Sequence, residues 1–402
     1  MKVSAKKRVI GIALLTAIAV MGDAMLFIVL PLYWEEFGLT ALWQIGVLLS
    51  VNRFVRLPLN PLVGLFYKHF QLRTGVFLAV LLATLTTMSY GMLQDFWLLF
   101  LMRALWGVAW SFLRLGGYLT VIETTNDSNR GNFVGLYNGL WGIGGLVGML
   151  AGGILVDYTS ISFVTSLFAW LAFFALPLVW LFVPVKAAEQ TKKQKKEENT
   201  RWLTRHVTLV LTTSLTMGFI VFGIFASTLS PLIERSYQDQ WSVAQLTIGA
   251  ATLAGVMQAI RWGWDPFVAP WIGKCLDRST SKIQLLLLPL FSGSVLLCFL
   301  GYVQSMILLL ILLLLFQFTS TFFVTTTDTL ATGVASKSDR VKVITAHTMV
   351  VDLGAAFGPL VAFYLIDNFS LTVVYILAAS LLFLLGVIWL FEQWRELMKA
   401  HK

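Results

Sequence analysis

The sequence is poor in charged residues and in cysteine. Only 12% of its 402 residues are charged, and the two cysteines, Cys275 and Cys298, lie in or beside apolar segments. This usage indicates neither a disulfide framework nor a metal site. The chain also lacks a G-x-x-x-x-G-K-[ST] segment, the phosphate-binding loop of many ATPases, which argues against ATP-driven pumping. We therefore expect no cofactor and no metal.

Apolar residues take the place of the missing charges. Hydrophobic side chains make up 58% of the chain, and its mean hydropathy is +0.81. Polar or turn residues divide the chain into twelve apolar segments, which we interpret as membrane-spanning helices. These segments cover residues 9–32, 42–66, 74–93, 96–121, 131–157, 162–184, 206–232, 243–272, 283–303, 305–333, 341–366 and 370–391. The sequence therefore predicts an all-α polytopic membrane protein.

The fifth segment, residues 131–157, is repeated 210 positions later as residues 341–367. Its glycines fall mostly three or four residues apart, a pattern that lets another helix approach closely in lipid. That pattern is compatible with packing alone and with a role in movement. Such internal self-similarity indicates two copies of one unit. The identities in register are Arg130 with Arg340, Gly144 with Gly354, Gly148 with Gly358, Asp157 with Asp367, and Ser160 with Ser370.

The net charge of +9 is distributed as the positive-inside rule requires. With a cytoplasmic amino terminus, 23 of the 29 lysines and arginines fall in cytoplasmic segments, and only Arg235 falls in an outer loop. The charges orient the chain, so no nucleic-acid partner is expected. We predict an N-terminal six-helix bundle at 1–184, a cytoplasmic linker at 185–205 and a C-terminal six-helix bundle at 206–402, with both termini cytoplasmic.

Nine ionisable residues remain inside the predicted spans. Each would cost roughly 3 kcal/mol at the bilayer centre, so the set would cost up to about 27 kcal/mol if every member faced lipid. We therefore expect these residues to face one another or a shared polar cavity. The basic members are Arg53, Arg56, Arg103, Arg114 and Arg261, and the acidic members are Asp23, Asp265, Asp328 and Asp352.

Helical spacing places several of these residues on common faces. Arg53 and Arg56 share one face of the second span, since residues three apart are neighbours on a helix. Arg261 and Asp265 are one turn apart, which predicts an ion pair of either a functional or a purely structural kind. The fourth span carries a stripe of Arg103, Gly107, Trp110 and Arg114. The tenth span carries a polar stripe of Gln317, Thr321, Thr325, Asp328 and Thr332.

Six spans on each side of a basic central loop resemble the major facilitator superfamily over essentially the whole chain. Glycines of the fifth span match the spacing of that family's antiporter signature, G-x8-G-x3-G-P-x2-G, with Met149 in place of the proline. The second copy has the dipeptide Gly358-Pro359, but Thr345 and Ala362 replace the first and last glycines. The matching glycines of the first copy are Gly135, Gly144, Gly148 and Gly152.

The family's loop signature, G-x-x-x-D-R, is present in one of its two positions. After the second span, residues 64–69 read GLFYKH, so the aspartate and arginine are lost. After the eighth span, residues 273–278 read GKCLDR and the signature is intact. The resemblance therefore implies the family's usual charge contact at the second cytoplasmic gate, where the signature is intact. The residues assigned to gating are Gly64, Gly273, Asp277 and Arg278.

The resemblance implies a secondary transporter that works by alternating access, with spans one, four, seven and ten lining a cavity. Arg103 and Gly107 are similar to the family's fourth-helix motif, whose arginine is implicated in proton coupling. A carboxylate in an apolar cavity binds a proton more readily than one in water, so Asp23 or Asp328 is expected to exchange a proton. The candidates for proton coupling are Asp23, Asp328, Arg103 and Asp352. The candidates for the substrate cavity are Arg53, Arg56, Trp110, Arg114, Gln317, Arg261 and Asp265.

Two substrate classes stay open for this transporter. Antiporter-type glycines, together with many aromatic and methionine side chains, favour export of an amphipathic compound. Four intramembrane arginines in the first half favour an organic anion, because guanidinium groups bind carboxylate and phosphate well. The expected partners are a small-molecule substrate, protons and the lipid bilayer, for a monomer in the cytoplasmic membrane of a bacterium.

Two other classes of function compete with transport. His347 and Asp352 spell the H-x4-D pattern of acyltransferases, but five residues on a helix place them on different faces at bilayer depth. We therefore predict no enzyme. A non-transporting membrane sensor in transporter form is the remaining alternative.

Overall fold

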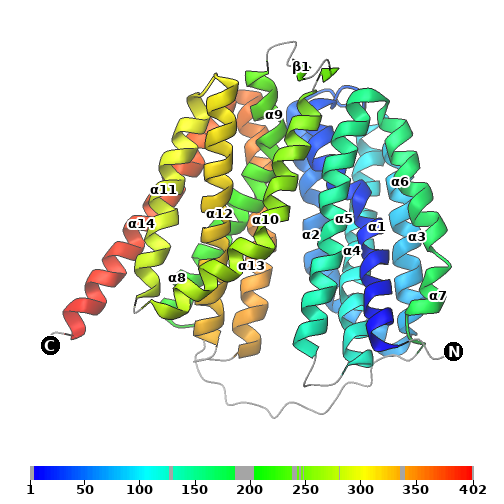
Figure 1. Ribbon diagram of the computed structural model, residues 1–402, viewed down its shortest axis with the longest axis horizontal. Helices are drawn as coiled ribbons and strands as arrows, with labels where there is room; N and C mark the ends of the chain where they lie inside the picture. Colours follow the sequence, from blue (N-terminus) through cyan, green and yellow to red (C-terminus); the bar gives the residue numbers. More distant parts are fainter. Residues whose placement is uncertain are drawn as a thin grey trace. The chain divides into compact units, whose positions relative to one another are not determined.

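The computed structural model describes residues 4–125, 130–185, 203–237, 242–243, 246–247, 249–279, 281–335 and 340–400. Helices occupy all twelve predicted spans (Figure 1). The first six spans correspond to α1 (Ala5–Leu32), α2 (Leu42–His69), α3 (Leu72–Tyr90), α4 (Phe96–Thr124), α5 (Arg130–Tyr158), and α6 (Ile161–Ala175) with α7 (Leu178–Phe182). The last six correspond to α8 (Arg205–Met217) with η1 (Gly218–Phe225) and α9 (Ala226–Ser236), α10 (Ala250–Arg278), α11 (Lys282–Tyr302), α12 (Met306–Ala335), α13 (Arg340–Asn368) and α14 (Leu371–Ala400).

Hydropathy supports a membrane location for most of these helices. Within the described ranges, nine helical segments are long and apolar enough to cross a bilayer. The other three spans are α6, which is shorter, and α2 and α10, which each combine two prolines with charged side chains. The predicted all-α polytopic class is confirmed.

Local sequence determines where several helices begin. The side-chain oxygen of Asp95 accepts a hydrogen bond from the backbone N–H of Leu98 at 2.9 Å, which caps the first turn of α4. Short polar side chains do the same at the starts of α1, α6 and α8. These caps are Ser4, Ser160 and Thr204.

Three predicted spans differ from the structure in detail. The sixth is interrupted at Pro177, because proline has no N–H to continue the ladder of α6. The seventh contains the eight-residue π-helical segment η1. The eighth was predicted to begin at 243, but α10 begins at Ala250, and the preceding residues form an antiparallel pair of short strands, β1 (Ser242–Val243) and β2 (Leu246–Thr247). Hydropathy alone does not distinguish a short apolar strand from the first turn of a helix.

The chain divides into two compact units. The first contains α1 to α7, the β1–β2 ladder and α10 as far as Trp262, and the second contains α8, η1, α9, the rest of α10 and α11 to α14. Helix α10 therefore contributes to both. The predicted domain boundaries at 184 and 206 stay a prediction, and residues 186–202 of the predicted linker lie outside the described residues.

Glycines of α5 bring α1 close in the first unit, where the two helices lie side by side (Figure 1). A Cβ placed on Gly148 would lie 2.5 Å from the carbonyl oxygen of Met21, and one on Gly144 would overlap the backbone of Ala17. Both helices use a four-residue spacing, so the close approach continues over successive turns.

The second copy of the repeat packs in the same manner inside the second unit. A Cβ on Gly354 of α13 would overlap the backbone of Leu215 on α8, and one on Gly358 would overlap the backbone of Gly223 on η1. The repeat seen in the sequence therefore corresponds to a repeated helix contact, made once in each unit.

Candidate functional site

An ion pair joins α1 to α4 inside the first unit. The Asp23 carboxylate accepts a charge-assisted hydrogen bond from Nη1 of Arg103. The side chain of Arg103 is 1% exposed and that of Asp23 is 13% exposed, so both charges are withdrawn from solvent. Asn52 on α2 donates from Nδ2 to the same carboxylate oxygen at 3.4 Å. The structure thus brings together two of the predicted coupling residues.

A glycine on α4 allows α2 to hold Arg103 in place. A Cβ on Gly107 would lie 2.5 Å from the carbonyl oxygen of Asn52, so the two helices are in backbone contact there. One turn earlier on each helix, Nε of Arg103 donates to the carbonyl oxygen of Leu48 at 2.8 Å. The Arg-x3-Gly pair therefore has a simple geometric meaning: the glycine brings α2 within reach of the arginine.

Tyr90 at the end of α3 covers the other side of Arg103. The guanidinium carbon lies 5.9 Å from the centre of the Tyr90 ring, which is in the range of a cation–π contact. The Tyr90 hydroxyl and Nη2 of Arg103 are both buried beside this contact. Tyr90 also lines a cavity of about 180 Å³ that Glu36, Ser160 and other polar residues share. The ring of Tyr90 is thus common to the ion-pair site and to this cavity.

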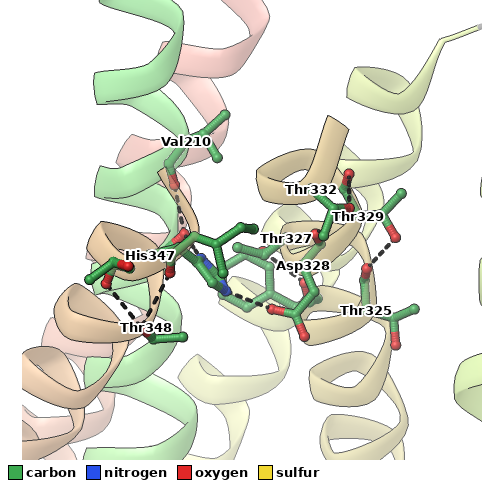
Figure 2. A network of polar contacts seen from close by, with 12 residues as sticks. Val210, Thr325, Thr327, Asp328, Thr329, Thr332, His347 and Thr348 are labelled. Carbon is green, nitrogen blue, oxygen red and sulfur yellow. Dashed lines mark hydrogen bonds and ion pairs between the residues drawn. The ribbon is translucent and has the colours of Figure 1, made fainter. Parts of the chain in front are cut away.

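A second polar cluster lies inside the second unit (Figure 2). Nε2 of His347 on α13 lies 3.1 Å from Oδ1 of Asp328 on α12. Nδ1 of the same ring lies 2.8 Å from the hydroxyl of Ser214 on α8. Asp328 is therefore paired with a histidine that sequence reasoning had considered only as part of an acyltransferase pattern. Counting the ring among the ionisable residues of the spans was the signal that could have found it.

The Asp328 side chain is 53% exposed, so it lies outside the apolar core of its unit. Counting 100° per residue, it lies roughly a third of a turn around α12 from the exposed apolar side chains Ile311 and Leu315. The neighbouring threonines bond to their own helix, as Thr325 does to the carbonyl of Thr321 at 2.8 Å. His347 is therefore the side chain that anchors the carboxylate.

A third group of polar side chains joins α10 to α12. The Thr321 hydroxyl donates to Oδ1 of Asp265 at 2.6 Å and lies 3.4 Å from the indole nitrogen of Trp264. One turn away on α12, Gln317 is fully buried, and neither of its amide atoms has a partner among the described residues. Two predicted cavity residues, Gln317 and Asp265, therefore lie on either side of Thr321, a member of the predicted polar stripe.

The other predicted basic residues differ in exposure. Arg53 is half-buried, with its guanidinium carbon 5.6 Å from the ring of Phe27. Arg56 is also half-buried, and Trp110 is buried. Arg114 is exposed, and it makes no hydrogen bond or ion pair within the part of the chain that the structure describes. Farther along, Arg261 is buried and Asp352 is half-buried.

The predicted gating positions lie at the ends of α2 and α10. A Cβ on Gly64 or Gly273 would have no described atom within 4 Å, and the same holds for Gly135 of the antiporter-like series. Arg278 is exposed, and the side chain of Asp277 lies outside the described residues. Elsewhere in that series, a Cβ on Gly152 would meet the side chain of Met25, and Pro359 is buried.

Tyr67 replaces the missing loop signature with a different contact. Its ring is buried, and its hydroxyl donates to the carbonyl oxygen of Phe112 on α4 at 2.9 Å. Gly75 of α3 and Gly116 of α4 leave room for the ring, because a Cβ on either would collide with it. The end of α2 is thus fixed by a buried tyrosine, which the degraded motif did not indicate.

The repeated Asp157 has a role that sequence reasoning did not assign. Its carboxylate accepts from the Tyr33 hydroxyl at 2.7 Å and from the backbone N–H and the hydroxyl of Thr252, at 2.8 and 2.6 Å. Thr252 lies in the first turn of α10, so Asp157 caps that helix from the last turn of α5. Its repeat partner, Asp367, is exposed.

Comparison with known proteins identifies the family. The sequence profile described as Major Facilitator Superfamily matches residues 12–264 and 266–400. The chain belongs to the Major Facilitator Superfamily. Its fold is that of the superfamily, with twelve membrane helices in two six-helix bundles, as predicted. The family and the fold are those of transporters of small molecules and not of enzymes.

Individual relatives are distant. Multidrug resistance protein MdtG of Klebsiella pneumoniae (strain 342) is 22% identical over 361 residues, which cover 87% of this chain and 85% of that protein. MdtG of Escherichia coli (strain K12 / DH10B) is 22% identical over 360 residues, covering 87% and 86%. A bacterial homologue of the human lysosomal transporter Spinster, in an inward-facing and occupied conformation, has a TM-score of 0.79 at 12% identity, with 95% of each chain covered. The nucleoside transporter NupG has a TM-score of 0.75 at 12% identity, covering 96% of this chain and 98% of that one.

Proposed function

We propose that this protein exports a small amphipathic organic compound in exchange for protons, by alternating access, with Asp23 as a proton acceptor. The observation that carries the proposal is the withdrawn ion pair between Asp23 and Arg103. The MdtG relatives are named multidrug resistance proteins, and the glycines of α5 resemble an antiporter signature. We further propose a monomer in the cytoplasmic membrane of a bacterium, with both termini in the cytoplasm and bundles at 1–184 and 206–402.

The chemistry follows from the different natures of the two charges. Arg103 stays charged at all physiological pH values and is held on α2 through the carbonyl of Leu48. Protonation of Asp23 removes the negative partner, and a buried guanidinium left unpaired costs about 3–5 kcal/mol. Any arrangement of the helices that gives Arg103 water or a new anion then becomes favourable by comparison. The proton thereby supplies a free-energy difference between two conformations, which is what coupling requires.

The test replaces the Asp23 carboxylate with an amide and measures gradient-driven transport separately from equilibrium exchange. In proteoliposomes with ethidium as the probe, we expect Asp23→Asn to lower accumulation driven by a pH gradient by at least about tenfold. Exchange of ethidium at equilibrium, without a gradient, should persist. Glu35→Gln, which neutralises an exposed carboxylate beyond the end of α1, is the matched control and should leave both rates unchanged. Gradient-driven accumulation by Asp23→Asn at the rate of the unmodified protein would refute the coupling role.

A second candidate substrate class rests on Arg114. This arginine is exposed on a membrane-spanning helix and is unpaired within the described residues. A guanidinium in that state is suited to a carboxylate or phosphate ligand. We expect Arg114→Gln to weaken binding of an anionic dye such as fluorescein by about tenfold if the substrate is an organic anion, and to leave ethidium binding unchanged. Thermal-shift titrations of the unmodified protein and of Arg114→Gln with both dyes decide between the classes. A protein that binds either dye but does not transport it in proteoliposomes would be a sensor.

A further inference from the structure

Ser214, His347 and Asp328 form a chain of contacts from the interior of the second unit to an exposed carboxylate (Figure 2). Ser214 is fully buried, the His347 side chain is 11% exposed and the Asp328 side chain is 53% exposed. The three side chains come from α8, α13 and α12, so the imidazole connects three helices. One of its nitrogens contacts the buried Ser214, and the other contacts the exposed carboxylate of Asp328.

This geometry satisfies the imidazole in both of its protonation states. In the charged state, Nε2–H donates to Asp328 and Nδ1–H donates to the Ser214 oxygen, while the Ser214 hydroxyl donates to the carbonyl of Val210 at 2.8 Å. In the neutral state, Nε2–H still donates to Asp328, and the Ser214 hydroxyl turns to donate to the bare Nδ1. A hydroxyl can both donate and accept, so a proton can be gained or lost without leaving a buried polar group unpaired.

Other charged groups around the site are farther away or engaged. On α8, Arg205 and His206 lie in the first turn, about 12 Å along the helix from Ser214. Arg205 is paired with Glu392 of α14 at 2.9 Å.

The remaining charges on α13 and on the segment packed against it point elsewhere. Lys342 and Asp352 lie five residues to either side of His347, which places each roughly 140° around the helix from it. Glu234 and Arg235 lie in the last turn of α9, where Arg235 donates to the backbone carbonyls of Leu300 and other residues. Asp328 is therefore the acidic partner that the contacts give to His347.

We propose that His347, with Ser214 and Asp328, is a second proton-binding site, and that an organic cation binding to Asp328 displaces its proton. This inference rests on the proposed function, since it specifies the substrate as cationic and adds a proton to the exchange. The exposed carboxylate is the shared element: it stabilises either the imidazolium or the cationic group of a ligand. One carboxylate cannot fully neutralise both charges, so each disfavours the other.

The exchange balances in charge and atoms. A cation that binds the Asp328 carboxylate leaves the imidazolium without its counter-ion, and the ring releases one proton to water. Neutral His347 keeps a hydrogen bond to Ser214, in which the donor is either Nδ1–H of the ring or the Ser214 hydroxyl. When the cation departs, a proton from water restores the imidazolium. On release, one N–H bond of the ring breaks and one O–H bond forms in water, and the return of the proton reverses both changes.

The test measures proton release on binding of a ligand that has no proton to give. Tetraphenylphosphonium is a permanent amphipathic cation, so any proton released from the purified protein in weakly buffered solution comes from the protein. At about pH 6, where imidazole groups are commonly charged, we expect up to about one proton per bound cation. We expect His347→Gln to bind the cation and release at most a small fraction of that amount, and Asp328→Asn to weaken binding of the cation by about tenfold.

Matched controls are available on the same chain. His69→Gln removes an exposed histidine at the end of α2, and Asp367→Asn removes an exposed carboxylate of α13; both should release protons as the unmodified protein does. Undiminished release by His347→Gln, or failure of tetraphenylphosphonium to bind, would overturn the inference. Release that disappears only in Asp23→Asn would also overturn it, while leaving the proposed function intact. If neither the unmodified protein nor any variant transported ethidium along a pH gradient, that result would instead count against the proposed function.

A second readout does not depend on a ligand. The chain has four histidines, so nitrogen-15 labelling of histidine gives a small set of signals, of which His347→Gln identifies one. Between about pH 5 and about pH 8, we expect Nδ1 of that ring to change from protonated to bare while Nε2 keeps its hydrogen. Ser214→Ala should leave the hydrogen on Nε2, because Nε2–H still donates to the Asp328 carboxylate. A His347 ring with the same protonation at both pH values would overturn the assignment as a proton site.

Discussion

The contact between Gly107 and α2 gives the most direct test of how Arg103 is positioned. A Cβ on Gly107 would lie 2.5 Å from the carbonyl oxygen of Asn52, whereas ordinary contacts begin at 3.4 Å. Gly107→Ala therefore requires α2 and α4 to separate by about 0.9 Å at this point. The hydrogen bond from Arg103 to the carbonyl of Leu48, now 2.8 Å long, would lengthen to about 3.7 Å, which is beyond hydrogen-bond range.

The expected cost is large for the addition of one methyl group. Loss of a hydrogen bond to a charged group costs about 1.5–3 kcal/mol, and overpacking of a close helix contact costs about 1–3 kcal/mol. Separation of the helices relieves the overpacking but breaks the hydrogen bond, so the two costs do not simply add. We expect the free energy of unfolding to fall by about 3 kcal/mol. Weakened support for the guanidinium should also reduce gradient-driven transport by more than it reduces equilibrium exchange.

Thermal unfolding of the purified protein and ethidium transport in proteoliposomes are the two measurements. Gly139→Ala is the matched control, because it adds the same methyl group to a helix at a position with nothing described within 4 Å. Alanine is the better helix former, so this control should be neutral or stabilising by up to about 1 kcal/mol. A Gly107→Ala protein that unfolds at the same temperature as the control would refute the backbone contact and the argument built on it.

Two smaller perturbations test the contacts that sequence reasoning missed. Asp157→Asn puts an amide where two donors of Thr252 converge. We expect faster amide hydrogen exchange in the first turn of α10 and a fall of about 1–3 kcal/mol in the free energy of unfolding. Asp367→Asn, which changes an exposed carboxylate, is the control and should have no effect. Tyr67→Phe removes the hydrogen bond to the carbonyl of Phe112, and we expect a loss of about 1 kcal/mol in thermal unfolding with no change in ethidium binding; a loss of binding instead would place Tyr67 in the ligand site.

The helices were predictable because each depends on local composition. A bilayer requires about twenty apolar residues for each crossing, and this requirement identified the twelve spans. The glycine repeat was predictable for a related reason, since a close helix contact needs only small residues at a fixed spacing on one helix. The start of α10 and the π-helical segment η1 were not predictable, because both depend on how backbone groups are satisfied and hydropathy does not report that.

The partners of individual polar side chains were the least predictable part of the site. Placing Asp23 and Arg103 on cavity-lining helices came from resemblance to a family, and their contact depends on Gly107 bringing a third helix into place. His347 is 19 residues from Asp328 and on the next helix, so no spacing rule relates them. The missed residues Tyr33, Thr252 and Ser214 are uncharged, and uncharged hydroxyls carry little signal in a membrane sequence.

The two units share a packing device but differ in the chemistry placed on it. In each unit, glycines of one long helix admit the backbone of its neighbour, and this contact depends only on the absence of side chains. The ionisable pairs use single side chains, so a single substitution changes the chemistry of one pair and leaves the glycine contacts in place. Arg103 carries a fixed charge, so a change of protonation within its pair would have to occur on Asp23. The second pair contains a histidine and a carboxylate, which we propose respond to a proton and to a cation respectively. We therefore expect Arg103→His to give the first unit a titratable pair, and the pH dependence of its ethidium exchange should then increase; an unchanged dependence would mean that the nature of the base does not matter at that position.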